Sequence, residues 1–402
     1  MKNGKYTAIL AISEIDETTV NDARRLFFAY KEKNIITEGL FDDDRWSLCD
    51  EYAVYHLDFQ LDEKAFEEFG LKMKITKGEF KNYMKTFVMC QMGDLAIVSL
   101  QKIVHDIKKT ACCEKNDIRL LLEEFDIRRT GHLSEFYSML PQEGREKELT
   151  ELLDKFDDAE EYARAGMSGG QRSLATFESY FRFDEIIKKF WQESKDEDEK
   201  LFFFPIWLWW NVSGVLPLRP REFVLTPRNC LTEINGEYYL TIRRSRIKGS
   251  GKTKAYKISD DYETMRYKIP QKLADEILWY LDRTKEFLDT DIHTLFVTDT
   301  HYAMWERRAP YTSRFFTYIN LRTCLRYFFE MIVQERYGYK VIFENSGAVL
   351  SNDKEIEYLH LGDTRHIALI NMIAEGATPM VAMMLAGHDN PEMSSHYYSN
   401  IT

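Results

Sequence analysis

The spacing of apolar residues predicts that helices dominate this chain. Between residues 76 and 109, apolar side chains recur every three or four positions, which indicates two amphipathic helices. Similar patterns predict helices over residues 146–165 and 174–191, and a long amphipathic helix over residues 312–338. The run LFFFPIWLWW at residues 201–210 is apolar on every side, and it therefore predicts a buried helix.

One segment gives a strong strand signal. Residues 231–244, LTEINGEYYLTIRR, place an Asn-Gly pair between alternating apolar positions, which predicts an antiparallel hairpin with a type I′ turn. Residues 268–288 begin a further strand-to-helix unit. Together the patterns predict a fold that is mainly α with a small antiparallel β-sheet.

The length of 402 residues favours two or three domains. The charge run QESKDEDEK at residues 192–200 separates two apolar segments, and such a run is typical of a solvated linker. We place the main boundary there. The predicted organisation is an N-terminal region over residues 1–71, a helical domain over 72–191, the linker, and a C-terminal domain over 201–402.

Residues 361–400 are punctuated as three short helices. Asp363 can cap the first, while Thr-Pro at 378–379 and Asn-Pro at 390–391 carry the signatures that open the second and the third. Arg365 therefore falls in the first turn of a helix. Backbone N–H groups and the helix dipole favour an anion at that position, so it suits a phosphate group.

Charge is unevenly distributed along the chain. The formal net charge is -12, which argues against a general affinity for nucleic acid. Residues 217–257 are the exception, with ten basic residues and only three acidic ones. Any contact with a polyanion should therefore concentrate in this basic segment. The candidate DNA contacts are Arg243, Arg244, Arg246 and Lys252.

The cysteines, the apolar runs and the N-terminus indicate which kinds of protein this chain resembles. The six cysteines form no CxxC pair and have no histidine at zinc spacing, so we expect buried free thiols and no bound metal. No uncharged apolar run reaches the roughly 18 residues that a membrane helix needs. The N-terminus lacks the apolar core and cleavage site of a signal peptide. These observations predict a soluble, cytoplasmic protein.

Five residues are ordinary individually, but their order and spacing along the chain indicate a common function. An arginine precedes a glutamate by three positions, a lysine lies in the Gly-rich turn IKGSGK, an arginine occurs in GDTRH, and a tyrosine follows a Gly-His pair by nine positions. In chain order they are Arg219, Lys248, Arg365, His388 and Tyr397. Over residues 205–400 this order resembles the tyrosine recombinase (phage integrase) family. The family pattern is an arginine in G-x-R-x-x-E, a hairpin lysine, H-x-x-R, G-H or G-W, and then the tyrosine.

The resemblance implies a site-specific DNA recombinase that serves a mobile element and forms a covalent 3′-phosphotyrosine intermediate. Arg219 and Arg365 would hold the phosphate oxygens by forked, charge-assisted hydrogen bonds, with His388 as a further donor. Tyr397 would attack the phosphorus, and Lys248 would protonate the leaving 5′ oxygen. Because the phosphotyrosine conserves the energy of the bond, neither ATP nor a metal cofactor is implied.

The resemblance also implies partners and domain roles. Double-stranded DNA would be the substrate, bound by a homo-oligomer that acts as a tetramer. Residues 72–191 would be the core-binding domain and 201–402 the catalytic domain, whereas 1–71 would be an arm-type or accessory region. Two other functions remain open: a catalytically impaired DNA-binding regulator, and DNA relaxation like that of a type IB topoisomerase.

The sequence departs from the family pattern where a histidine is expected. Gly362 occupies that position, and it has no side chain to act as a base or donor. Asp363, His360 and His366 are the candidates to compensate for it. The nearest of them to the second arginine is His366, which matches a histidine common in the family.

The C-terminal end departs in two further ways. Tyr397 and Tyr398 are adjacent, and neighbours on a helix point about 100° apart, so only one can face the phosphate. Spacing selects Tyr397 and leaves Tyr398 as the alternative. The chain ends at Thr402, where family members usually continue into a tail helix. We therefore expect either that another surface joins the protomers or that this is a shortened product.

Overall fold

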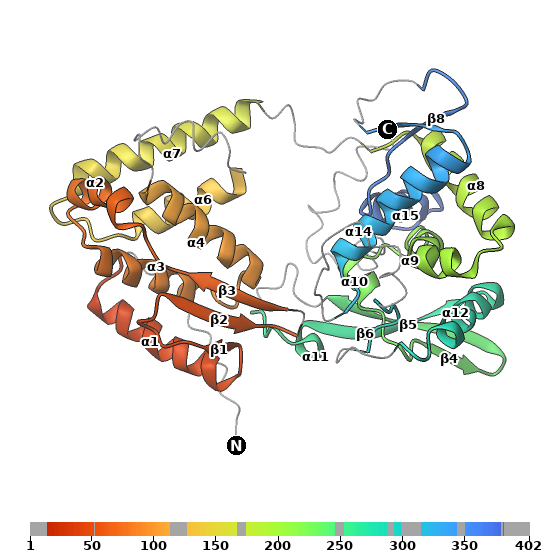
Figure 1. The fold of residues 1–402 in the computed structure, drawn as a ribbon, viewed down its shortest axis with the longest axis horizontal. Coiled ribbons are helices and arrows are strands. Elements are labelled where there is room, and N and C mark those ends of the chain that lie inside the picture. Colours follow the sequence, from red (N-terminus) through yellow and green to blue (C-terminus); the bar gives the residue numbers. More distant parts are fainter. Residues whose placement is uncertain are drawn as a thin grey trace. The chain divides into compact units, whose positions relative to one another are not determined.

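The structure is a computed structural model, shown in Figure 1, and the fold is mainly helical with small β-sheets, as the sequence predicts. It describes residues 14–51, 53–112, 127–166, 174–245, 253–287, 293–298, 315–343, 350–378 and 381. Its contacts divide the chain into two compact units. The first comprises Met1–Gly170 and Thr253–Tyr256, and the second comprises Gln171–Lys252 and Lys257–Thr402.

The first unit combines helices with a three-stranded antiparallel sheet of order β1-β2-β3. Helices α1, α2 and α3 begin at side-chain caps: Thr76, for example, forms a reciprocal capping box with Glu79 at the start of α3. The sheet was not predicted from the sequence. The elements are α1 (Glu17–Glu32), β1 (Ile36–Glu38), β2 (Arg45–Cys49), β3 (Val54–Asp58), α2 (Glu63–Met73), α3 (Lys77–Gln91), α4 (Ile97–Ala111), α6 (Ile127–Ser138) and α7 (Glu146–Gly166).

One hydrophobic core runs through the whole first unit. Trp46 of β2 packs against Phe27 of α1 and Phe59, while Phe80 of α3 packs against Phe136 of α6. All five side chains belong to the same buried cluster. A boundary between residues 71 and 72 would cut this core, so the structure does not separate 1–71 from the helices that follow.

The segment Thr253–Tyr256 is part of the first unit. The Tyr256 hydroxyl accepts a hydrogen bond from the Gly93 N–H at 2.9 Å and donates one to the Leu95 carbonyl at 2.6 Å. Gly93 has φ +93°, a left-handed conformation that favours glycine.

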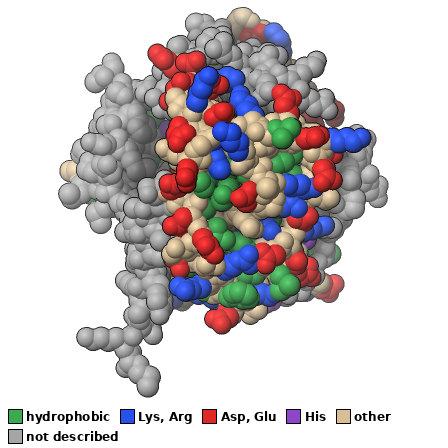
Figure 2. Space-filling view, turned by 90° about the vertical axis from the view of Figure 1, so that its left-hand side faces the viewer, with side chains coloured by type: hydrophobic (Ala, Val, Ile, Leu, Met, Phe, Trp, Pro, Cys, Tyr) green, Lys and Arg blue, Asp and Glu red, His purple; other side chains and the backbone are tan. Residues whose placement is uncertain are grey.

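Figure 2 shows one face of the molecule, on which acidic and basic side chains are mixed and do not form separate patches.

Lys85 of α3 is a cation buried in the first unit, with 1% of its surface exposed. Its ammonium lies 5.8 Å from the centre of the Phe41 ring and 5.6 Å from that of Phe59. Burial lowers the pKa of Lys85 to about 8, although the nearby charges of Asp42 and Asp44 oppose that shift. The protein therefore carries the cost of a charged, desolvated lysine at neutral pH.

We expect Lys85→Met to raise the free energy of unfolding at pH 7 by about 1–2 kcal/mol, because the substitution removes that desolvation cost. Between pH 8 and about 10.5 the unfolded chain keeps the Lys85 proton that the folded chain has lost. Wild-type stability should therefore rise with pH across this interval, and the rise should be smaller in the variant. Urea unfolding at several pH values measures both effects, with exposed Lys64→Met as the control. A wild-type pH dependence that Lys85→Met leaves unchanged would refute this account.

The second unit is built around α9 (Glu197–Ser213), the apolar helix predicted from its sequence. Most of its aromatic side chains, including Phe203 and Trp209, are buried, and Pro205 lies within the helix. The other elements are α8 (Phe177–Glu193), α10 (Pro220–Val224), β4 (Leu231–Ile234), β5 (Glu237–Ser245), α11 (Ile258–Asp261), β6 (Tyr262–Ile269), α12 (Gln271–Arg283), α14 (Tyr318–Tyr327), η1 (Phe328–Arg336), β7 (Lys340–Ile342), β8 (Glu355–Glu357) and α15 (Asp363–Ala374).

The charge run at residues 192–200 is not a linker between the units. It lies inside the second unit, where α8 ends and α9 begins. Glu199 is buried, and its carboxylate accepts hydrogen bonds from both terminal nitrogens of Arg336, at 2.5 and 3.0 Å. The compact units divide earlier, between Gly170 and Gln171. The ion pair between Glu199 and Arg336 therefore links the start of α9 to η1, which is distant in the sequence.

The predicted hairpin is present as β4 and β5, which form an antiparallel sheet with β6. Asn235 and Gly236 both have positive φ, at +53° and +79°, as a type I′ turn requires. A long helix was predicted over residues 312–338, of which the structure describes residues 315–338. In this part, α14 is followed directly by the π-helix η1. A short parallel pair, β7 and β8, completes the sheets of the described chain.

The described cysteines are free thiols, as the sequence predicts, but they are not all buried. Five cysteines are free thiols, of which Cys230 and Cys324 are buried and the other three partly buried. Burial raises the pKa of Cys230 to about 12, so this thiol stays protonated at neutral pH. Within the described ranges, no helix has both the length and the apolar character that crossing a bilayer requires.

Candidate functional site

Arg219 occupies the N-cap of the short helix α10. Pro220 follows at the first helical position, where a missing N–H costs nothing. The Glu222 carboxylate accepts a hydrogen bond from the Arg219 backbone N–H at 2.8 Å and another from Arg219 Nη1 at 2.9 Å. The R-P-x-E sequence therefore folds into a local arrangement that fixes the arginine side chain, which remains 20% exposed.

Glu222 connects this turn to the neighbouring sheet. Its side chain is 1% exposed, and its carboxylate also accepts a hydrogen bond from the Ser245 N–H at the end of β5, at 3.0 Å. Arg244 Nε lies 3.6 Å from the same carboxylate. A buried carboxylate with these partners is satisfied by charge and by hydrogen bonds. Glu222 thus holds α10, Arg219 and β5 in one arrangement.

Arg365 reaches the same turn from a distant part of the sequence. It lies in the first turn of α15 and is buried, and its Nη1 donates a 2.7 Å hydrogen bond to the Pro217 carbonyl. Pro217 precedes Arg219 by two residues and is 148 positions from Arg365. Trp209 Nε1 donates to the Leu361 carbonyl at 3.3 Å, which fixes the chain just before α15. The fold therefore brings Arg365 to the segment that carries Arg219.

Asp363 does not cap α15, contrary to the prediction. Gly362 is the N-cap, and Asp363 is the first helical residue. The buried Asp363 carboxylate accepts a 2.8 Å hydrogen bond from the His360 N–H, and the Asp363 N–H donates to the His360 carbonyl at 2.9 Å. These bonds close the turn that leads into the helix. His366 is partly exposed, and the chemical roles suggested for these side chains stay predictions.

Part of the basic segment serves the fold. Arg243 Nη1 donates to the Leu225 carbonyl at 2.9 Å, and Arg244 is buried against Glu222. Because Arg244 is buried against Glu222, it supports the arrangement of β5 and α10, and its predicted contact with DNA stays a prediction. Arg228 bonds the carbonyls of Leu295 and Leu281, and burial lowers its pKa. The sequence did not distinguish these supporting arginines from surface ones.

The supporting role of Glu222 was also not assigned from the sequence. The signal that the sequence offered was the spacing of three residues between Arg219 and Glu222, which fits the first turn of a helix. Its contacts with Ser245 and Arg244 depend on tertiary structure. The remaining predicted site residues lie outside the described part of the chain. They are Arg246, Lys248, Lys252, His388, Tyr397 and Tyr398.

Comparison with known proteins gives only structural similarity. No family model and no curated protein matches the chain. A XerH site-specific recombinase in a pre-cleavage complex with difH substrate is 13% identical, with a TM-score of 0.39, and the match covers 96% of this chain and 95% of that one. XerA recombinase is 13% identical, with a TM-score of 0.32, over 79% of this chain and 93% of that one.

A lambda integrase (75-356) dimer bound to a COC' core site is 15% identical, with a TM-score of 0.32. That match covers 75% of this chain and 89% of the integrase chain. Two of these three proteins are thus recombinases, and the third is an integrase.

Proposed function

We propose that this protein is a DNA strand transferase of the tyrosine recombinase type, which cleaves and rejoins DNA at specific sites. The observation that supports the proposal most is that two arginines from distant positions in the sequence are held at the same short segment, residues 217–219. Arg365 binds the Pro217 carbonyl, and Arg219 is held two residues further on by a buried glutamate. A pair of positioned guanidinium groups suits a phosphodiester, which gains negative charge on its non-bridging oxygens as it is attacked.

The reaction would begin with Tyr397. A tyrosine phenol has a pKa near 10 in water, so Tyr397 would need a cationic setting to release its proton to solvent, and Arg219 and Arg365 would provide that setting. The phenolic oxygen forms a bond to phosphorus as the bond from phosphorus to the 5′ oxygen breaks. Lys248 gives a proton to the departing 5′ oxygen, and His388 adds a hydrogen bond to the phosphate. Attack by a 5′ hydroxyl on the phosphotyrosine reverses these steps and rejoins the strand.

The supporting residues would act by positioning. Glu222 orients Arg219 and joins α10 to the end of β5, which leads along the chain to Lys248. The substrate would be double-stranded DNA, bound by several copies of the chain, with a tetramer as the expected assembly. The proposed reaction conserves the energy of the phosphodiester and needs neither a nucleotide nor a metal cofactor.

The proposal predicts that Arg365→Ala slows DNA cleavage about 10²–10³-fold, because it removes charge stabilisation from the transition state. The substrate is a pool of nicked duplexes with randomised sequence around the nick, so that cleavage releases a short fragment and traps the covalent adduct. The rate of adduct formation is followed on denaturing gels. Arg283→Ala removes an arginine from an ion pair that is half exposed at both partners, and serves as the matched control.

The same assay separates the alternatives. Wild-type protein that binds the duplexes and yields no adduct would be a regulator and would contradict the proposal. Relaxation of supercoiled plasmid by monomers without strand exchange would identify a topoisomerase-like activity instead. Arg365→Lys, which keeps the charge and loses the forked geometry, should remain folded and cleave slowly. A normal rate in that variant would show that the forked contact is not used.

A further inference from the structure

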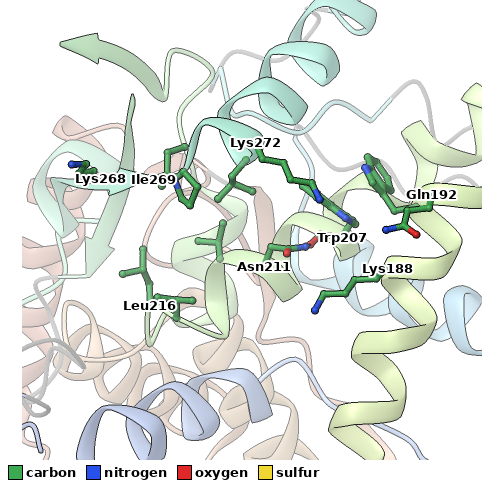
Figure 3. Close-up of a pocket in the computed structure, with 13 residues that line it drawn as sticks. Lys188, Gln192, Trp207, Asn211, Leu216, Lys268, Ile269 and Lys272 are labelled. Carbon is green, nitrogen blue, oxygen red and sulfur yellow. The ribbon is translucent and has the colours of Figure 1, made fainter. Parts of the chain in front are cut away.

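A cavity of about 370 Å³ lies in the second unit, between α8, α9 and the start of α12. Figure 3 shows its labelled lining, with Lys188 on α8, Trp207 and Asn211 on α9, and Lys272 on α12. The volume falls within the range of about 300–1,000 Å³ that is typical of small-molecule sites. Neither Arg219 nor Arg365, the candidate catalytic arginines that the structure describes, lines it, and the proposed DNA chemistry gives it no role.

One wall of the cavity is aromatic. The rings of Trp191 and Trp207 stack with their centroids 4.7 Å apart and their planes at 21°. Both residues are more than nine-tenths buried, and the apolar lining continues with Val212 on α9 and Leu216 just after that helix. A planar, apolar group would bury its surface well against such a wall.

The polar groups of the lining favour a negative charge. Lys188, Lys268 and Lys272 line the cavity, and no Asp or Glu is among its described lining residues. In Figure 3 the side chains of Lys188 and Lys272 extend from their helices toward the space beside Trp207 and Asn211. Lys188 pairs with Asp184 and Lys268 pairs with Glu237, each at 2.5 Å. Lys272 is therefore the lysine that we expect to contribute most to binding an anion.

One further feature favours a ligand with a negative charge. The helix α12 begins at Pro270 without a side-chain cap and with no acidic residue in its first turn. Its first N–H groups therefore add positive potential on the side of the cavity that carries Lys272.

From these contacts we infer that the cavity binds a small organic anion with a planar aromatic body, such as an aromatic carboxylate or sulfonate. The aromatic body would lie against Trp207 and Val212. The acid group would face Lys272 and the start of α12. This inference does not depend on the proposed DNA chemistry.

The test is a fluorescence titration of the full-length protein with a charged and an uncharged probe of similar shape. These are 8-anilinonaphthalene-1-sulfonate and N-phenyl-1-naphthylamine. We expect saturable binding of the sulfonate at one site per chain and at least tenfold weaker binding of the neutral probe. Lys272→Glu should weaken sulfonate binding about tenfold and leave the neutral probe unaffected, because it reverses one charge near the acid group.

Lys285→Glu is the matched control, since Lys285 follows the other end of α12 and does not line the cavity. It should leave both affinities unchanged. Equal binding of the two probes, or equal effects of the two substitutions, would overturn the inference. Lys272 is exposed, so its variant should fold, and circular dichroism before the titration checks this directly.

Discussion

Replacing Tyr397 with phenylalanine is expected to abolish the covalent protein–DNA adduct and to leave DNA binding nearly unchanged. The substitution removes the oxygen that would attack phosphorus, and no other group in the proposed reaction can take its place. Phenylalanine keeps the ring, so packing should change little. Adduct formation on the pool of nicked duplexes gives the chemical readout, and a gel-shift assay at fixed salt gives the binding readout.

Tyr398→Phe is the control supplied by the chain itself. It removes the same atom from the next residue, whose side chain would point about 100° away on a helix. The Tyr398 variant should form adduct at close to the wild-type rate. If the two variants behave in the opposite way, Tyr398 is the nucleophile and the assignment from spacing is wrong.

Replacing Glu222 with alanine is expected to lower the free energy of unfolding of the second unit by about 3–5 kcal/mol, because it leaves buried positive charge without its counter-charge. Arg244 is 6% exposed at its side chain, and Arg219 and the Ser245 N–H lose the same acceptor. Glu222→Gln keeps an acceptor oxygen and should cost less. Cleavage should slow in both variants, because Arg219 loses the partner that orients it.

Urea unfolding followed by tryptophan fluorescence suits this measurement, since Trp191, Trp207, Trp209 and Trp210 all lie in the second unit. Glu330→Ala is the control. Glu330 pairs with Arg326 at 3.4 Å in a partly exposed setting, so its loss should cost less than about 1 kcal/mol. Equal destabilisation by Glu222→Ala and Glu330→Ala would show that the buried carboxylate does not support the site.

Local patterns in the sequence predicted the elements whose signals are strong. The all-apolar segment became α9, and the Asn235-Gly236 turn became the β4–β5 hairpin. The sheet of the first unit was missed because its strands are only three to five residues long, too short for alternation to be clear. Three to five residues offer too few alternating apolar and polar positions to identify a strand from the sequence.

Features that depend on distant partners were not predictable in the same way. The charges at residues 192–200 resemble a linker until Arg336, 137 positions from Glu199, is placed beside that glutamate. The sequence pointed to Arg219 and Arg365 as site residues. It did not indicate that Arg365 would bind the Pro217 carbonyl, because that contact requires α15 to pack near α10. It also placed Arg244 among surface contacts, whereas the structure buries it.

The central claim is that the protein joins itself to DNA through a tyrosine near residue 397. The most direct measurement is mass spectrometry of the purified adduct after nuclease digestion and cleavage before Asp389, which releases the peptide DNPEMSSHYYSNIT. Fragmentation of this peptide distinguishes Tyr397 from Tyr398. The account predicts a nucleotide-linked phosphate on Tyr397. An adduct whose phosphate is carried by a serine, a histidine or any residue outside this peptide would contradict it.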